Sequence, residues 1–163
     1  MKHYFLIISA LLLFSISVNA AELKLDGFSF QFPGNWKVNN NENGSKSAIF
    51  DSNGKKKEFE LTVLHPTTQE ETIGFLENIQ DYIGNIYQVN NSLKIVQKFS
   101  EYKTKSGAPF MYIVYSGKNS DEFFIGSSLG STSGILMITF AGIGGHVDAV
   151  AEFKTIIETM SID

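Results

Sequence analysis

Four strand-like segments, joined by turns of only a few residues, constrain this fold more than any other feature of the chain. Connections this short can join only antiparallel neighbours, because a parallel pair needs a crossover of a dozen or more residues. The second half of the chain is therefore predicted to form an antiparallel sheet. The segments are Leu93–Lys103, Pro109–Ser116, Glu122–Ser128 and Ile135–Gly142.

Two of these segments are apolar at both alternating sets of positions, which indicates central strands covered on both faces. They are residues 110–115 (FMYIVY) and 135–141 (ILMITFA). We therefore expect an α/β (α+β) fold. An antiparallel sheet of six to seven strands would carry packed helices as a three-layer α/β/α sandwich.

The first half of the chain supplies further strands. Apolar residues alternate from Leu23 to Phe32, with Asp26-Gly27 as a bend, and Pro33-Gly34 ends the run. Trp36 follows as a large apolar residue, which we expect to be a buried anchor. Asn53-Gly54 favours a tight hairpin turn, because both residue types tolerate positive φ.

The Asn53-Gly54 turn would join strands at Ala48–Asp51 and Glu58–Leu64. The polar segment Asn39–Lys46 (NNNENGSK) before them is predicted to be a mobile loop.

Two helices are expected, at Thr68–Tyr87 and at His146–Met160. Thr68 with Glu71 three residues later matches a capping box. Each helix has an apolar stripe at helical spacing, which predicts a face turned to the core. The stripes are Ile73, Leu76, Ile79, Ile83 and Ile86 in the first helix, and Val147, Val150, Phe153, Ile157 and Met160 in the second.

The first twenty residues match a secretory signal peptide. Lys2 precedes an apolar run from Tyr4 to Ile16, and Val18 and Ala20 stand at −3 and −1 of a cleavage site. The run is too short for a membrane anchor, which takes about 20 apolar residues. We predict cleavage after Ala20, a single domain over residues 21–163, no stable membrane insertion afterwards, and a periplasmic or secreted location.

Composition excludes several classes of function. The chain has no Cys, which removes disulfides, thiolate zinc sites, cysteine nucleophiles and a lipidated cysteine. It also has no Arg. Beyond the signal segment the chain has 12 Lys and 17 acidic residues, which gives a net charge of −5. Nucleic-acid binders need a basic footprint, so nucleic acid is not an expected partner.

No motif points to catalysis or to a cofactor. Gly126–Gly130 (GSSLG) matches G-x-S-x-G, but a nucleophile elbow needs a strand that turns into a helix, and no His follows at the required place. A hydrolase using Ser128 is therefore the weakest alternative. His65 and His146 are too few for a zinc site, and Glu58 with Glu60 is interpreted as a solvated strand face. We expect no catalytic residue, metal or cofactor.

Residues Phe28–Trp36 (FSFQFPGNW) resemble the F-x-F-x-x-P-x-x-W signature of the PsbP-like superfamily, and the expected order of strands and helices agrees over the whole exported chain. The family includes bacterial DcrB-type envelope proteins and the photosystem II extrinsic protein. The resemblance implies the fold and a non-catalytic binding role. It carries over no functional residue, and the lipidated Cys of DcrB-type proteins is missing here.

These observations predict an exported, soluble binding or adaptor protein of the bacterial cell envelope, without catalytic activity. The partner would be another envelope or secreted protein. Two alternatives stay open: an inhibitor or immunity protein against a toxic or hydrolytic enzyme, and a small-ligand carrier with an apolar cavity between sheet and helix. The residues expected to contact a partner are Asn41, Asn43, Lys55, Lys56, Lys57, Phe75 and Tyr82.

Overall fold

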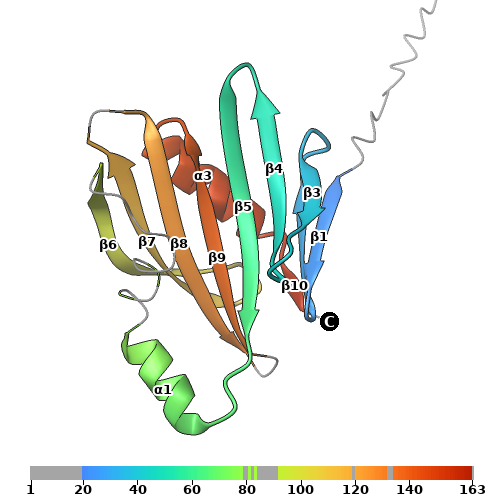
Figure 1. Cartoon of the computed structure of the whole chain (residues 1–163), viewed down its shortest axis with the longest axis vertical. Helices are drawn as coiled ribbons and strands as arrows, with labels where there is room; N and C mark the ends of the chain where they lie inside the picture. Colours follow the sequence, from blue (N-terminus) through green and yellow to red (C-terminus); the bar gives the residue numbers. More distant parts are fainter. Residues whose placement is uncertain are drawn as a thin grey trace, which may run out of the picture.

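The computed structural model describes residues 20–78, 81, 83, 92–118, 120–131 and 134–162. Within them the chain forms two helices and ten strands (Figure 1). The helices are α1 (Gln69–Glu77) and α3 (His146–Ile157). The strands are β1 (Ala21–Leu25), β2 (Phe28–Phe32), β3 (Lys37–Asn40), β4 (Lys46–Ser52), β5 (Lys55–Leu64), β6 (Leu93–Lys103), β7 (Pro109–Gly117), β8 (Glu122–Ser131), β9 (Gly134–Ile143) and β10 (Ser161–Ile162).

Seven strands form one antiparallel sheet in the order β3-β4-β5-β9-β8-β7-β6, here called the large sheet. The short turns after β4, β6, β7 and β8 each join hydrogen-bonded neighbours, as their lengths predict. The two halves of the chain meet where β5 pairs with β9, from Lys57 opposite Gly142 to Leu64 opposite Ile135. The expected mixed α+β class with an antiparallel sheet is confirmed.

The small sheet, in the order β1-β2-β10, corrects the expectation of one bent strand. Asp26 and Gly27 both have positive φ, 46° and 81°, so the chain reverses and β1 pairs with β2 as a hairpin. The C-terminal end then adds β10, with Ser161 opposite Ser29 and Ile162 opposite Phe28.

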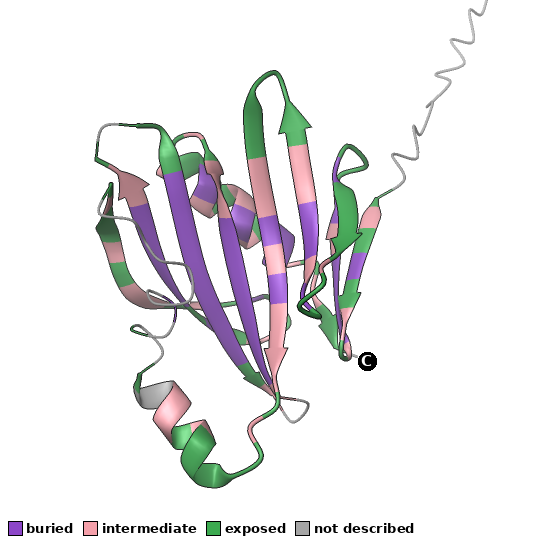
Figure 2. Ribbon diagram, viewed as in Figure 1, coloured by how far each residue is buried: buried purple, intermediate pink, exposed green. Residues whose placement is uncertain are grey.

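One face of the large sheet is covered by both α3 and the small sheet. Figure 2 shows buried residues along most of β7, β8 and β9, in the middle of this assembly. The main core is rich in aromatic side chains that are no more than 2% exposed, from β2, the large sheet and α3: Phe28, Phe30, Phe32, Phe59, Phe110, Phe123, Phe140 and Phe153.

The opposite face carries a smaller apolar cluster formed by Ile83, Ile113, Tyr115, Phe124, Ile135 and Met137. Phe75 of α1 packs against this cluster, while α1 itself lies beyond the ends of the strands in Figure 1. Of the two helices that the structure describes, α3 is the one that lies along the large sheet.

Trp36 is an anchor within the main core, as expected, with 4% of its surface exposed. Its ring centroid lies 5.2 Å from that of Phe32 in β2, 5.8 Å from Phe50 in β4 and 6.2 Å from Phe140 in β9. Trp36 therefore joins the small sheet to the large one.

The helices differ from prediction at particular residues. Thr68 caps α1, since its hydroxyl accepts the Glu71 backbone N–H at 3.1 Å. Ile73 in α1 and Val147 at the start of α3 were expected in core stripes, but they are 46% and 70% exposed. The side chains of Leu76, Ile79 and Ile86 lie outside the described residues.

The last helix ends at Ile157 instead of Met160, because the chain must leave it to reach β2 as β10. Among the residues described, no helix combines the length and the apolar character needed to cross a membrane.

Candidate functional site

An open apolar pocket of about 460 Å³ lies between the end of β2 and α3. Two groups of residues line it: Ala20, Gln31, Phe32 and Pro33 on one side, and Glu152, Thr155, Ile156 and Thr159 on the other. The second group is spaced at i, i+3, i+4 and i+7, which places these residues on one face of α3 and its last turn. We call this site the β2–α3 pocket.

Strand pairing explains why the pocket lies there. The two-residue β10 pairs only with the first half of β2, at Phe28 and Ser29. Beyond that point the edge of β2 faces the end of α3, and the Gln31 backbone N–H donates to Thr159 Oγ1 at 2.9 Å. Ala20 reaches the pocket because the next residue, Ala21, pairs with Phe32.

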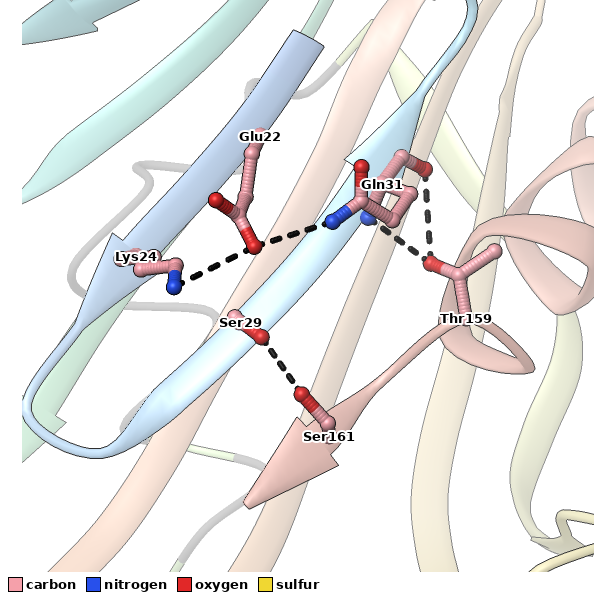
Figure 3. Close-up of polar contacts among 6 residues, drawn as sticks. All are labelled: Glu22, Lys24, Ser29, Gln31, Thr159 and Ser161. Carbon is pink, nitrogen blue, oxygen red and sulfur yellow. Dashed lines mark hydrogen bonds and ion pairs between the residues drawn. The ribbon is translucent and has the colours of Figure 1, made fainter. Parts of the chain in front are cut away.

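Several polar groups that line the pocket have hydrogen-bond partners of their own, and Figure 3 shows contacts of Gln31 and Thr159. Gln31 Nε2 donates to Glu22 Oε1 at 3.0 Å, and Thr159 Oγ1 donates to the Ile156 carbonyl at 2.6 Å. Thr155 Oγ1 donates to the Ala151 carbonyl at 2.9 Å. With these groups engaged, the pocket presents almost entirely carbon to a ligand.

The carboxylate of Glu152 at the pocket is neutralised by Lys57, with which it forms an ion pair. Both side chains are about a quarter exposed, 31% for Glu152 and 21% for Lys57. The Lys57 ammonium also lies 5.7 Å from the centre of the Phe50 ring. Lys57, one of the residues expected to contact a partner, is a counterion beside the pocket.

The three consecutive lysines do not form one patch. They lie in β5 and not in the turn before it, so their side chains alternate between the two faces of the large sheet. Lys55 and Lys57 share one face, while Lys56 lies on the other, opposite Asp51 of β4. Lys55 and Lys56 are exposed.

Asn41 and Asn43 are structural residues of a tight turn, which corrects the prediction of a mobile loop over residues 39–46. Residues 39–40 and 46 belong to β3 and β4, and buried Ser45 organises the residues between them. The Ser45 hydroxyl lies 2.7 Å from Asn43 Oδ1 and 2.5 Å from Glu60 Oε1, and it accepts from Asn41 Nδ2 at 2.9 Å.

The structure does not bring the expected contact residues together. The turn at residues 41–45 and the lysines lie at opposite ends of β4. Phe75 is half-buried against the smaller apolar cluster, so it belongs to the core margin. Tyr82 lies outside the described residues.

A second polar contact lies at the end of α3. Tyr102 donates its hydroxyl to Glu158 Oε1 at 2.5 Å, and the Lys105 backbone N–H donates to Glu158 Oε2 at 3.0 Å. The Tyr102 hydroxyl, followed by the Lys105 N–H, holds the pKa of Glu158 below its ordinary value of 4.5. The same hydrogen bond raises the pKa of Tyr102 above 10.0.

The motif around Ser128 lies wholly inside β8, so it does not form the strand-to-helix turn of a nucleophile elbow. His65 Nε2 lies 3.2 Å from Asp26 Oδ2, where it ties the β1–β2 turn to the end of β5. Among the described residues, no three His, Asp or Glu side chains gather as a metal site.

Comparisons with known proteins give similarity to solved structures alone. No family model matches the chain, and no curated protein matches it. A crystal structure from Bacteroides thetaiotaomicron resembles it with a TM-score of 0.40 and 12% sequence identity. The match covers 84% of this chain and 45% of that one, so this chain spans less than half the length of the solved protein.

Proposed function

We propose that this chain is an exported, non-catalytic binding protein of the bacterial cell envelope that holds an apolar ligand in the β2–α3 pocket. The observation that carries the proposal is the pocket itself, about 460 Å³ between a sheet and a helix, with its polar groups already engaged. A cavity between sheet and helix is also what the small-ligand carrier alternative requires.

Size and chemistry support this function. Small-molecule sites range from about 300 to 1,000 Å³ and are mostly apolar with a few polar groups that orient the ligand. Here Phe32, Pro33 and Ile156 provide apolar walls, and Glu152 with its counterion Lys57 lies at the side. An apolar ligand entering the pocket would remove these walls from water at about 25 cal/mol per Å².

We also propose that the fold is a three-layer α/β/α sandwich of the PsbP-like type. The FSFQFPGNW segment forms β2, the Pro33 turn and buried Trp36, which is consistent with that signature. Asp81 and Ile83 are helical, and Ile83 is buried in the smaller apolar cluster. The expected helix Thr68–Tyr87 would cover this cluster and so form the third layer.

The test is ligand binding by a pocket-filling variant and a matched control. Thr155→Phe places an aromatic ring in the pocket, at an exposed α3 position where substitution costs little packing. Ala151→Phe adds the same ring one helical turn earlier, at an exposed position that does not line the pocket. The probe is dodecan-1-ol, a neutral apolar chain, measured by isothermal calorimetry.

We expect Thr155→Phe to weaken dodecanol binding at least about tenfold, because the ring occupies the space that the alkyl chain needs. Ala151→Phe should bind like the unmodified protein. Equal affinity in all three proteins, or no binding by the unmodified protein at concentrations where dodecanol stays dissolved, would refute the proposed function. Circular dichroism establishes that both variants are folded.

A further inference from the structure

Ala20 has two roles that coincide. It is a wall of the β2–α3 pocket, and it is the last residue of the expected signal peptide. Cleavage after Ala20 would therefore remove one wall and leave a new α-amino group on Ala21. That nitrogen is bonded to the Ala20 carbonyl carbon, at about 1.3 Å, so cleavage places an ammonium at the pocket itself.

Pairing fixes where this ammonium lies. Ala21 is the first residue of β1 and stands opposite Phe32, another residue of the pocket wall. The residue that carries the amine is thus paired within the small sheet. An α-amino group is largely protonated at neutral pH.

The acidic groups near this position already have counterions. Glu152 is paired with Lys57. Glu22 lies 3.3 Å from the Lys24 ammonium and also accepts the Gln31 amide, as Figure 3 shows. The Ala21 ammonium therefore adds a positive charge that is not balanced by these carboxylates, next to a pocket of apolar surface.

We propose that the processed protein binds single-chain fatty acids, with the alkyl chain in the β2–α3 pocket and the carboxylate on the Ala21 ammonium. This inference rests on the proposed function and adds the chemistry of the head group. It also makes signal-peptide cleavage the event that completes the site, because the unprocessed chain has an uncharged peptide bond at this place.

The experiment compares two ligands and three forms of the protein. Dodecanoate carries the carboxylate, and dodecan-1-ol has the same chain without the charge. The proteins are the chain Ala21–Asp163, the same chain acetylated on its α-amine, and a chain that begins at Ala20. All strands and helices of the described residues lie within residues 21–162, and circular dichroism verifies that each form is folded.

We expect acetylation to weaken dodecanoate binding about five- to tenfold, which is the strength of one charge-assisted contact. The chain that begins at Ala20, whose amine is displaced by one residue, should show a similar loss. Dodecanol should bind the three forms within about twofold of one another.

The outcomes separate the two proposals. If dodecanol and dodecanoate both bind and acetylation changes neither, the fatty-acid assignment is wrong and the apolar-ligand function stands. A loss that is equal for both ligands would show that acetylation blocks the pocket sterically, and it would also overturn the assignment. If neither ligand binds any form, the proposed function itself fails.

Discussion

Gly126 and Gly130 stand four residues apart in β8, and they differ in what surrounds them. A Cβ atom built on Gly126 would lie 2.4 Å from Ile83 Cγ2, far inside van der Waals contact. A Cβ on Gly130 would have no heavy atom within 4 Å. The glycine at 126 therefore allows buried Ile83 to approach the sheet, and the one at 130 has no such role.

Gly126→Ala should lower the free energy of unfolding by about 1 to 3 kcal/mol, because the added methyl overpacks the contact with Ile83. Gly130→Ala is the matched control in the same strand. It should leave stability unchanged or raise it slightly, since alanine reduces the entropy of the unfolded chain. Urea denaturation followed by circular dichroism measures both, and equal stabilities would contradict this account of Gly126.

The hydrogen bond between Tyr102 and Glu158 predicts that the stability of the protein depends on pH. The pKa of Glu158 is lowered in the folded state, so its contribution is present above 4.5 and is lost as pH falls through the folded-state pKa. Tyr102→Phe removes the hydroxyl but keeps the ring under Lys154, whose ammonium lies 4.9 Å from the ring centre. The pKa of Glu158 should rise in this variant.

Thermal melts at pH 7 and pH 3 measure this effect. The destabilisation caused by Tyr102→Phe should be larger at pH 7 and should shrink as the pH falls below 4.5 and through the folded-state pKa of Glu158. Because the pKa of Tyr102 is raised, its own contribution is present below pH 10.0 and is lost as pH rises through the folded-state value. A difference between the two proteins that is constant from pH 3 to pH 7 would argue against the hydrogen bond.

At the scale of elements, the parts that depend on local sequence were predictable. Asn53-Gly54 forms the expected hairpin turn, with φ of 52° and 75°, and Thr68 caps α1. The strand Leu93–Lys103 has the predicted bounds. In each case the residues that decide the structure lie within a few positions of one another.

The elements that were missed depend on distant partners. β3 is exposed along its length and has no apolar alternation, and it is a strand because it pairs with β4. β10 is two residues long and exists because β2 accepts it. Asn41 looked like a free loop residue, but Glu60, nineteen positions away, holds it through a hydrogen bond of 3.3 Å.

Substitution of Trp36 tests how the two sheets are joined. Trp36→Ala should lower the free energy of unfolding by about 3 to 5 kcal/mol, because it leaves a cavity among Phe32, Phe50 and Phe140. Val38→Ala, two residues away and 38% exposed, should cost less than about 1 kcal/mol. Wild-type-like melting of Trp36→Ala would show that Trp36 is not an anchor.

At the scale of the whole molecule, the sequence predicts an antiparallel sheet but not how distant segments assemble around it. The pairing of β5 with β9 joins strands about seventy residues apart, and no turn signal specifies it. The β2–α3 pocket arises because β10 is shorter than β2. Thr155 on α3 and Thr159 just after it line this pocket, but in the sequence they have the pattern of solvated residues beside an apolar helical stripe.

The structure also bears on where the exported chain would begin. β1 starts at Ala21, whose partner Phe32 is 1% exposed, so a chain cleaved after Ala20 keeps all five residues of the strand. We expect protein isolated from a bacterial periplasm to have the mass of residues 21–163.

Cleavage five residues later would remove β1 and expose the inward side chains of β2, and a chain that begins at Asp26 should be unstable or insoluble. Intact-mass spectrometry of the periplasmic fraction measures the first point, and the melting temperature of the shortened chain measures the second. Retention of Met1 in a membrane fraction would show that the N-terminal segment is an anchor, and the ammonium on which fatty-acid binding depends would then never form in the cell.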